Sequence, residues 1–277
     1  ILKLKDFVSI KANWNDKASN ILEISRELNL GLDSFVFIDD NPVEREIVKQ
    51  CIPDIEAPDF PLEPSYLNKW FVSEIMYDFF PKLSLTGEDK NKTKQYIANA
   101  KRVKSSKSLD MNTFIKNLKI KLKLLIDDKK FIDRFSQLTQ KTNQFNMTTK
   151  RYTNLDIESF MNSKNHLVFG IEYEDRFNNE GIVGTSIVKT DNSNATIDTF
   201  LMSCRVIGRN VEYEFLDLII KHLSSHRSTL STLSTHYCPT AKNEVSKDFY
   251  KNTNLNFVKK DNGNIFYKSS LKSLLNK

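Results

Sequence analysis

An apolar run ends abruptly on two arginines at residues 203–212, SCRVIGRNVE, and a helix-like pattern follows directly. The preceding ATIDTFLMSC has the short apolar character of a strand, and the following VEYEFLDLIIKHL repeats apolar residues at helical spacing. A strand that ends in Arg-x-x-Gly-x-Asn and enters a helix directs backbone N–H groups and the positive end of the helix dipole at one point. The stretch therefore predicts an anion site, with an ordinary loop carrying two surface arginines as the alternative.

Four residues of this loop have a role in the anion-site interpretation. Gly208 lets the backbone approach a ligand closely, and Asn210 tolerates a positive φ and favours helix starts. Arg205 and Arg209 add positive charge suited to a phosphate. The predicted cradle consists of Arg205, Val206, Ile207, Gly208, Arg209 and Asn210.

The composition bounds the class of protein. At 277 residues with 39% apolar side chains, the chain is long enough for two folded units. No apolar run approaches the roughly 18 residues that span a membrane, so a soluble, cytoplasmic protein without a membrane segment is expected. The three cysteines, Cys51, Cys204 and Cys238, lie far apart, which argues against a disulfide framework or a zinc site.

The formal net charge of +6 is carried largely by lysine-rich stretches such as residues 90–107. A solvated helix face explains such a stretch, and an anion-binding surface for a phosphorylated cofactor or an acidic carrier protein is the sharper alternative. Nucleic acid is not expected as a partner, because the basic residues are not interleaved with stacking aromatic residues. Nothing in the sequence indicates an oligomeric state.

Residues 1–64 follow the order helix, strand, acidic loop, helix. Apolar spacing predicts a helix over 15–28, SFVFIDDN is typical of a buried parallel strand, and PVEREIVKQCI predicts a helix that begins at Pro42. A proline-rich stretch over 53–64 ends this piece. The order predicts part of a doubly wound α/β sheet, followed by a helical connector over 65–111.

Residues 112–277 alternate strand and helix patterns and form the second expected domain. A polar loop, KTNQFNMTT, is expected between its first two helices. The expected strands are 119–126, 166–174, 181–190, 195–204, 230–238, 255–260 and 265–270. The expected helices are 128–140, 153–162, 211–223 and 243–252.

An acidic pair follows the apolar strand of the first domain. Asp39 and Asp40 lie at its carboxyl end, where open α/β sheets gather their ligand sites. Two adjacent carboxylates repel each other unless a cation neutralises them, and Mg²⁺ favours carboxylate oxygen. The structural alternative is that Asp40 or Asn41 caps the helix beginning at Pro42.

Two segments of the second domain resemble the GNAT acyltransferase fold over roughly residues 112–268. The loop Arg205–Asn210 is similar to the family's R/Q-x-x-G-x-G/A loop, which holds the pyrophosphate of coenzyme A. NEVSKDFYKNTNLNF resembles a second GNAT element, which implies that Asn243 lies near the pantetheine arm and Tyr250 protonates the leaving thiolate. The chain departs from the pattern at Asn210 and at Asn254–Asn256, where the family has a small residue and a glycine.

Four segments together resemble the FkbH-like proteins, in which a HAD-like phosphatase module precedes a GNAT-like domain. They are NWNDKASNI, FIDDNPVERE, QLTQKTNQFNMTTKRY and FLMSCRVIGRNVE. The resemblance implies that Lys17 and Asp39 are catalytic in the HAD-like module and that Asp39 and Asp40 bind Mg²⁺. No D-x-D motif precedes Lys17, so residues 1–64 are expected to be the C-terminal part of that module, without its nucleophile.

The fold class expected from these observations is α/β: a partial, doubly wound (Rossmannoid) HAD-like segment, a helical connector and a GNAT-like mixed-sheet α+β domain. The function it implies is GNAT-type acyl transfer to or from the phosphopantetheine thiol of coenzyme A or an acyl carrier protein. FkbH-like proteins are associated with loading a glyceryl unit from a bisphosphorylated glycerate, so the acyl group implied for the full-length protein is glyceryl.

Two other functions stay open. One is a non-catalytic GNAT-like module that binds a carrier and supports a magnesium-dependent HAD-like phosphatase or glyceryltransferase. The other is a phosphatase activity of this chain itself, which is not expected without the nucleophile. A general base is sought at Glu172 or Glu174, which alternation allows to share a strand face. His236 and Cys238 could face the same cleft, although a core or surface role is preferred for both. Cys204 is a candidate acyl acceptor, although a small buried hydrophobic role is preferred for it.

Overall fold

The computed structural model describes residues 3–28, 30–81, 87–106, 110–227 and 229–275. The chain divides into two compact units, unit 1 spanning Ile1–Asp110 and unit 2 spanning Met111–Lys277. The connector expected over 65–111 includes residues 82–86 and 107–109, which lie outside the described residues. No helix within the described ranges is long and apolar enough to cross a membrane.

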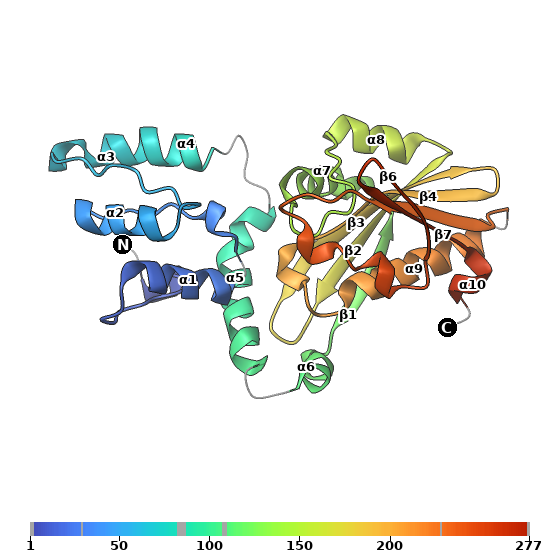
Figure 1. Cartoon of the computed structure of the whole chain (residues 1–277), viewed down its shortest axis with the longest axis horizontal. Coiled ribbons are helices and arrows are strands. Elements are labelled where there is room, and N and C mark those ends of the chain that lie inside the picture. Colours follow the sequence, from blue (N-terminus) through green and yellow to red (C-terminus); the bar gives the residue numbers. More distant parts are fainter. Residues whose placement is uncertain (1–2, 29, 82–86, 107–109, 228, 276–277) are drawn as a thin grey trace. The chain divides into compact units, whose positions relative to one another are not determined.

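Unit 1 is mostly helical (Figure 1). Its small core contains Ala18, Ile21, Val48, Ile52 and Ile55, which come from α1, α2 and the segment after α2. The helices are α1 (Lys17–Leu28), α2 (Pro42–Cys51), α3 (Leu67–Trp70), a π-helical turn (Phe71–Met76), α4 (Tyr77–Phe79) and α5 (Gly87–Ser106).

The strand expected at SFVFIDDN is not formed as a regular strand. Val36 makes an isolated parallel bridge with Glu56, in which Phe37 N–H donates to Glu56 O at 2.7 Å. Phe35, Val36 and Phe37 are half-buried, and Ile38 is exposed. The apolar run predicted a fully buried strand, but among the described residues only the 55–57 segment pairs with it.

Unit 2 is built on one seven-stranded mixed sheet with the order β1-β2-β3-β4-β5-β7-β6. Only the β4–β5 pair is parallel, and the other neighbours are antiparallel. The strands are β1 (Lys121–Ile126), β2 (His166–Glu174), β3 (Asn179–Asp191), β4 (Asn194–Met202), β5 (Thr232–Tyr237), β6 (Asn256–Asp261) and β7 (Asn264–Ser270). The mixed sheet confirms that part of the expected fold class.

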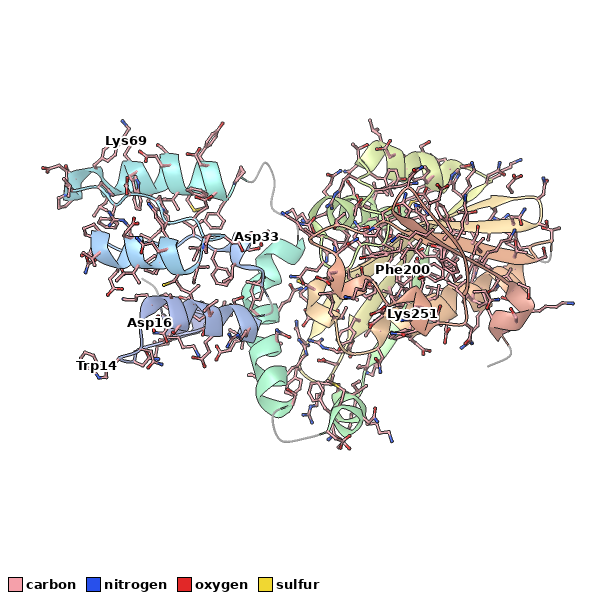
Figure 2. All side chains as sticks on the ribbon, viewed as in Figure 1. Trp14, Asp16, Asp33, Lys69, Phe200 and Lys251 are labelled. Carbon is pink, nitrogen blue, oxygen red and sulfur yellow. The ribbon has the colours of Figure 1, made fainter. Side chains whose placement is uncertain are left out.

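Helices cover both faces of this sheet (Figure 1). On one face α7 and α8 pack through Phe135, Leu138 and Ile157, and on the other α9 packs through Phe215 and Ile219. Phe200 of β4 lies deep in the unit (Figure 2). The helices of this unit are α6 (Met111–Leu118), α7 (Ile132–Lys141), α8 (Asn154–Asn162), α9 (Val211–His226) and α10 (Leu271–Leu275).

The two parallel strands β4 and β5 pair over only a short distance. Asn194–Thr196 pair with Thr232–Ser234, and no pairing is formed between the two strands beyond that point. The space between their carboxyl ends is filled by residues 145–147 from the loop between α7 and α8. Where β4 and β5 diverge, residues 145–147 therefore continue the hydrogen bonding between them.

The helix expected over 243–252 is absent. The segment forms two separate 3-10 turns, Glu244–Ser246 and Tyr250–Asn252. Asn243 and Ser246 are buried there, and Asn243 O accepts from the Ser246 hydroxyl at 2.9 Å and from the Tyr237 hydroxyl at 3.1 Å. Because these tertiary contacts take up the carbonyl of Asn243, they compete with a regular helical ladder.

Candidate functional site

The loop between β4 and α9 has the left-handed backbone that an anion cradle requires. β4 ends at Met202, a 3-10 turn covers Cys204–Val206, and Gly208 and Asn210 then have φ values of 79° and 61°. A Cβ placed on Gly208 meets no atom within 4 Å, so the backbone at this position faces open space. Peptide N–H groups near left-handed residues form concave anion-binding surfaces.

Asn210 starts α9 but does not cap it as the sequence suggested. Its left-handed conformation sets the turn, and its side chain makes no capping hydrogen bond. The first N–H groups of α9 have no acceptor within their own helix, and the helix dipole adds positive potential there. The two apolar residues of the loop face the core: Val206 is buried and Ile207 is half-buried.

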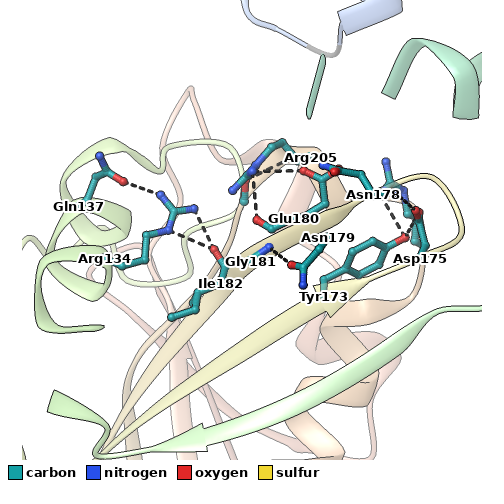
Figure 3. Close-up of polar contacts among 12 residues, drawn as sticks. Arg134, Gln137, Tyr173, Asp175, Asn178, Asn179, Glu180, Gly181, Ile182 and Arg205 are labelled. Carbon is teal, nitrogen blue, oxygen red and sulfur yellow. Dashed lines mark hydrogen bonds and ion pairs between the residues drawn. The ribbon is translucent and has the colours of Figure 1, made fainter. Parts of the chain in front are cut away.

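Arg205 is tied into the fold rather than directed at solvent. Its guanidinium lies 3.2 Å from the Glu180 carboxylate and donates to the Glu180 backbone oxygen at 3.3 Å (Figure 3). It also donates to the Ser203 hydroxyl at 3.1 Å. The Glu180 side chain is fully buried, so the arginine charge is balanced by a carboxylate inside the protein.

Arg209 is also buried, and it contacts the end of β2. It donates to the Tyr173 hydroxyl at 3.2 Å and lies over the Tyr173 ring, 5.4 Å from its centre. Tyr173 in turn donates to Asp175 at 2.8 Å, and burial raises the pKa of Tyr173 to about 12. Asp175 accepts the N–H groups of Phe177 and Asn178, which fixes the β2–β3 turn seen in Figure 3.

Glu212 places a carboxyl in the first turn of α9, close to the loop. It is 9% exposed, and burial raises the pKa of its carboxyl above the ordinary value. A carboxyl that keeps its proton more readily repels a nearby phosphate less than a fully charged one does. The residue was not singled out from the sequence, because acidic residues are common in first helical turns.

Asn243 does not face open space for a pantetheine arm. It is fully buried, and its amide nitrogen donates to Asn146 O at 2.8 Å and to Cys238 O at 2.9 Å. Its side-chain oxygen accepts from the Tyr237 hydroxyl and from Thr240 N–H. The side chain thus connects the end of β5 with the segment inserted beside it.

Tyr250 is fully buried in the aromatic core. Its hydroxyl bonds the Thr235 hydroxyl of β5 at 2.9 Å, and its ring lies near Phe200, Phe249 and Tyr267. Burial raises the pKa of the phenol, which holds the proton on the oxygen. Its role as an acid stays a prediction, and a thiolate reaches it only if the surrounding segments move.

The secondary candidates have local structural partners. Burial raises the pKa values of the Cys204 and Cys238 thiols, which keeps both in the weakly nucleophilic thiol form. Burial and the nearby Lys150 lower the pKa of His236, which lies on a half-buried strand face and stacks on Phe266. Glu172 and Glu174 form cross-strand ion pairs with lysines of β1.

In unit 1 the structure brings Lys17 and Asp39 together. The Lys17 ammonium is 3.6 Å from the Asp39 carboxylate, while Asp40 is exposed. Arg45 donates to the backbone oxygens of Asp39 and Asp40 at 2.8 and 3.2 Å, which holds the turn. Asn41 accepts from Val43 N–H at 2.9 Å and caps α2, so the capping role falls on Asn41.

The turn that holds Asp39 and Asp40 offers carboxylate oxygens, the kind of ligand that Mg²⁺ prefers. Mg²⁺ commonly takes one or two protein carboxylates and completes its shell with water or phosphate oxygens. Asp39 and Asp40 supply two carboxylates at adjacent positions, with one Asp39 oxygen already accepting from Asn41 N–H at 2.9 Å. Across the described residues no group of three or more His, Cys, Asp or Glu is placed to share a metal ion.

The solved structures to which the chain is similar include several N-acetyltransferases. The ribosomal-protein-S18-alanine N-acetyltransferase from Escherichia coli is 12% identical, covers 55% of this chain and 94% of its own, and gives a TM-score of 0.41. An N-acetyltransferase from Staphylococcus aureus Mu50 is 16% identical, with coverages of 55% and 98% and a TM-score of 0.40. Both TM-scores lie below 0.5, so neither likeness assigns a substrate to this chain.

A second kind of similarity concerns a shorter stretch. The N-terminal part of the protein BF1531 from Bacteroides fragilis, described as containing a phosphatase domain complexed with Mg, is 39% identical over 31% of this chain. This chain spans 22% of that structure, with a TM-score of 0.28. No protein-family model matches the chain, and no curated protein sequence matches it either.

Sequence reasoning missed the residues that hold the loop in place. Glu180, Tyr173 and Asp175 lie at the β2–β3 turn (Figure 3). Glu180 contacts Arg205, and Tyr173 contacts both Asp175 and Arg209. The sequence gives no signal for Glu180, because this residue follows two asparagines at the start of β3 and is typical of a polar turn. Its burial is what requires a charged partner. Its partner, 25 residues along the chain, is brought close only by the β3–β4 pairing and the turn after β4.

Proposed function

We propose that unit 2 is an acyltransferase domain of the GNAT type that moves an acyl group to or from a phosphopantetheine thiol. The observation that carries this proposal is the β4–α9 loop, with left-handed Gly208 and Asn210, open space above Gly208 and the start of a sixteen-residue helix. The thiol belongs to coenzyme A or to an acyl carrier protein, since both present a phosphate at the end of a pantetheine arm.

In this proposal the phosphate is bound mainly by backbone. Arg205 and Arg209 position the loop through Glu180 and Tyr173, while the N–H groups at the start of α9 receive the anion. The acyl thioester supplies the reacting carbonyl when it is bound. Tyr250 supplies a proton to the departing thiolate, and its buried phenol keeps that proton until the thiolate forms.

Unit 1 has a separate place in the proposed function. We propose that it is part of an FkbH-like arrangement, in which Asp39 and Asp40 hold Mg²⁺ and Lys17 faces a phosphoryl group. The short distance between Lys17 and Asp39 supports this, because a lysine beside a metal-binding carboxylate is placed to contact the same phosphate. The acyl group would then be a glyceryl unit carried to an acyl carrier protein.

A second candidate function is a non-catalytic carrier-binding module in the same protein. The observation that favours it is the occupied space between β4 and β5, where Asn243 bonds Asn146. In that case the loop binds the carrier's phosphate, but the thioester does not reach Tyr250. The two candidates share the phosphate site and differ in whether acyl transfer occurs.

An acyl-exchange assay distinguishes the candidates. The full chain is incubated with acetyl-coenzyme A and a phosphopantetheinylated acyl carrier protein, and the acyl group on the carrier is followed by intact-protein mass spectrometry. Exchange that is lost in Gly208→Val supports the transferase, since a branched side chain is strained at positive φ and fills the open space.

The matched control is Gly263→Val, which makes the same change at a φ of 81° in the β6–β7 turn and should leave exchange intact. Binding of the carrier without acyl exchange indicates the non-catalytic module. If neither coenzyme A nor the carrier binds, both candidates are contradicted.

A further inference from the structure

Residues 145–147 lie between β4 and β5 and hydrogen-bond to both strands. On the β4 side, Met147 N–H donates to Phe200 O at 3.0 Å and Met202 N–H donates to Phe145 O at 2.9 Å. On the β5 side, Cys238 N–H donates to Met147 O at 2.8 Å. This short piece of chain therefore acts as an inserted strand in the gap where the two parallel strands diverge.

The inserted residues are packed as tightly as the core. Phe145 is 3% exposed and Met147 fully buried, and both belong to the cluster under α9. Phe145 contacts the rings of Phe200 and Phe249, at 6.4 and 5.2 Å between centres. Asn146 is also fully buried, and its side chain bonds Thr142 O and Thr149 N–H.

Asn243 connects this insertion to the proposed acyl site. The residue that the GNAT resemblance assigns to the pantetheine arm instead donates to Asn146 O at 2.8 Å. A pantetheine arm carries two amide groups, and amides pair with strand backbone as a peptide does. The peptide groups of residues 145–147 thus use the hydrogen-bonding groups of β4, β5 and Asn243 that an amide-bearing arm would need.

The insertion is followed by an ionic contact to the same strand. Lys150 forms an ion pair with Asp198 of β4, and the Tyr152 hydroxyl donates to the other Asp198 oxygen at 2.6 Å. Asp198 lies at a β-bulge. Thr199 pairs with Ile187 and Ile197 pairs with Val188, so Asp198 between them has no partner on β3. Burial raises the pKa of Asp198, but hydrogen bonds from Lys150 and Tyr152 outweigh it and hold the pKa below its usual range.

We propose that residues 142–152, the closing segment, occupy the pantetheine path of unit 2 and must leave it before a thioester reaches Tyr250. The Lys150–Asp198–Tyr152 contact holds the closing segment in the closed state. This inference rests on the proposed function, because it concerns the same site. In this closed state the β4–α9 loop is accessible to a phosphate, while the closing segment fills the path of the pantetheine arm.

A binding equilibrium follows from this arrangement. When only a fraction of molecules is open, the apparent dissociation constant rises by the inverse of that fraction. Weakening the contact at Asp198 should increase the open fraction, and a partly exposed ion pair of this kind corresponds to a change of about fivefold. The residue is 25% exposed and lies outside the aromatic core, so its replacement by asparagine keeps the fold.

The experiment compares the full chain with Asp198→Asn and with Lys150→Ala. Coenzyme A binding is measured by calorimetry, and hydrogen exchange of the segment containing Met147 is measured by mass spectrometry with and without coenzyme A. The matched control is Asp261→Asn, which removes the carboxylate of another Lys–Asp pair, Lys259–Asp261 at 2.9 Å, in the β6–β7 hairpin. We expect both test variants to bind about fivefold more tightly than the control.

Coenzyme A should also speed exchange at Met147 in every variant, because the closing segment leaves when the ligand enters. If coenzyme A binds equally to all variants and Met147 stays protected in the complex, the inference is overturned and the proposed function survives. If Asp198→Asn releases Met147 yet coenzyme A and the carrier fail to bind, the proposed function fails, and the inference fails with it.

Discussion

At position 205 the charge of an arginine serves the loop's structure. Arg205 contacts the buried Glu180 carboxylate and the Ser203 hydroxyl. Its replacement by alanine leaves that carboxylate without its cation, so the free energy of unfolding should fall by about 3 kcal/mol. Urea denaturation followed by circular dichroism measures the change.

Lys121→Ala is the comparison for this measurement, because it breaks the exposed pair with Glu174, at 3.4 Å, and should cost less than about 1 kcal/mol. An Arg205→Ala chain as stable as Lys121→Ala would show that the Arg205–Glu180 pair does not hold the loop.

Glu212 should make stability depend on pH. Burial raises its folded-state pKa, so the folded protein binds this proton more tightly than the unfolded chain does. Stability is therefore lost as pH rises from the unfolded-state pKa through the folded-state pKa, and it stays lower above that range. Glu212→Gln should then be more stable than the natural chain at pH 7 and should differ little from it near pH 4.

Thermal unfolding at pH 4 and pH 7 tests this, with Glu214→Gln, a first-turn residue that is less buried, as the control. An equal effect of Glu212→Gln at both pH values would contradict the role given to burial.

Among the elements of unit 2, the hydrogen bond from the Asn243 side chain to Asn146 O connects the closing segment to the chain that follows β5. Asn243→Ala removes hydrogen bonds to Asn146 O and Cys238 O and leaves both oxygens buried. The free energy of unfolding should fall by about 2 kcal/mol. Exchange at the amides of Met147 and Cys238 should rise together, because Cys238 N–H donates to Met147 O.

Thr253→Ala serves as the control, since its hydroxyl bonds Tyr250 O within one local turn, and it should leave exchange at Met147 unchanged. If exchange at Met147 and Cys238 is unchanged in Asn243→Ala, the Asn243–Asn146 hydrogen bond does not hold the closing segment in place.

The elements of unit 2 show which secondary structure local sequence patterns predict and which they do not. Alternating and apolar runs predicted the seven strands of unit 2, and helical spacing predicted α7, α8 and α9, because each pattern depends on local periodicity. The helix over 243–252 was wrong, since buried contacts of Asn243 and Ser246 override local propensity. The loop KTNQFNMTT was expected as a loop, but its insertion beside β4 depends on partners about 55 residues away and has no local signal.

The candidate site was predictable in its backbone and less so in its side chains. Gly208 and Asn210 both have a positive φ, a conformation that the sequence allowed at Asn210 and that glycine adopts readily. The partners of Arg205 and Arg209 come from another hairpin, so the sequence suggested two free charges where the structure has Glu180 and Tyr173.

At the scale of the whole molecule, the two units should fold separately. Unit 2 has a hydrophobic cluster on each face of its sheet, and unit 1 has a cluster of its own. A chain of residues 111–277 should therefore unfold cooperatively, at the same temperature as unit 2 within the full chain. Differential scanning calorimetry of both chains checks this, and a fall of more than about 4 °C, roughly 1 kcal/mol for a domain of this size, would show that unit 2 needs unit 1.

In the proposed function, the β4–α9 loop of unit 2 binds the phosphate of a pantetheine carrier. The most direct measurement is calorimetric titration of the full chain with coenzyme A and, separately, with pantetheine, which has the same arm but no phosphate. We expect coenzyme A to bind at least tenfold more tightly, a difference of about 1.4 kcal/mol, and Gly208→Val to remove the difference. Equal binding of the two ligands, or a preference for coenzyme A that persists in Gly208→Val, would contradict it.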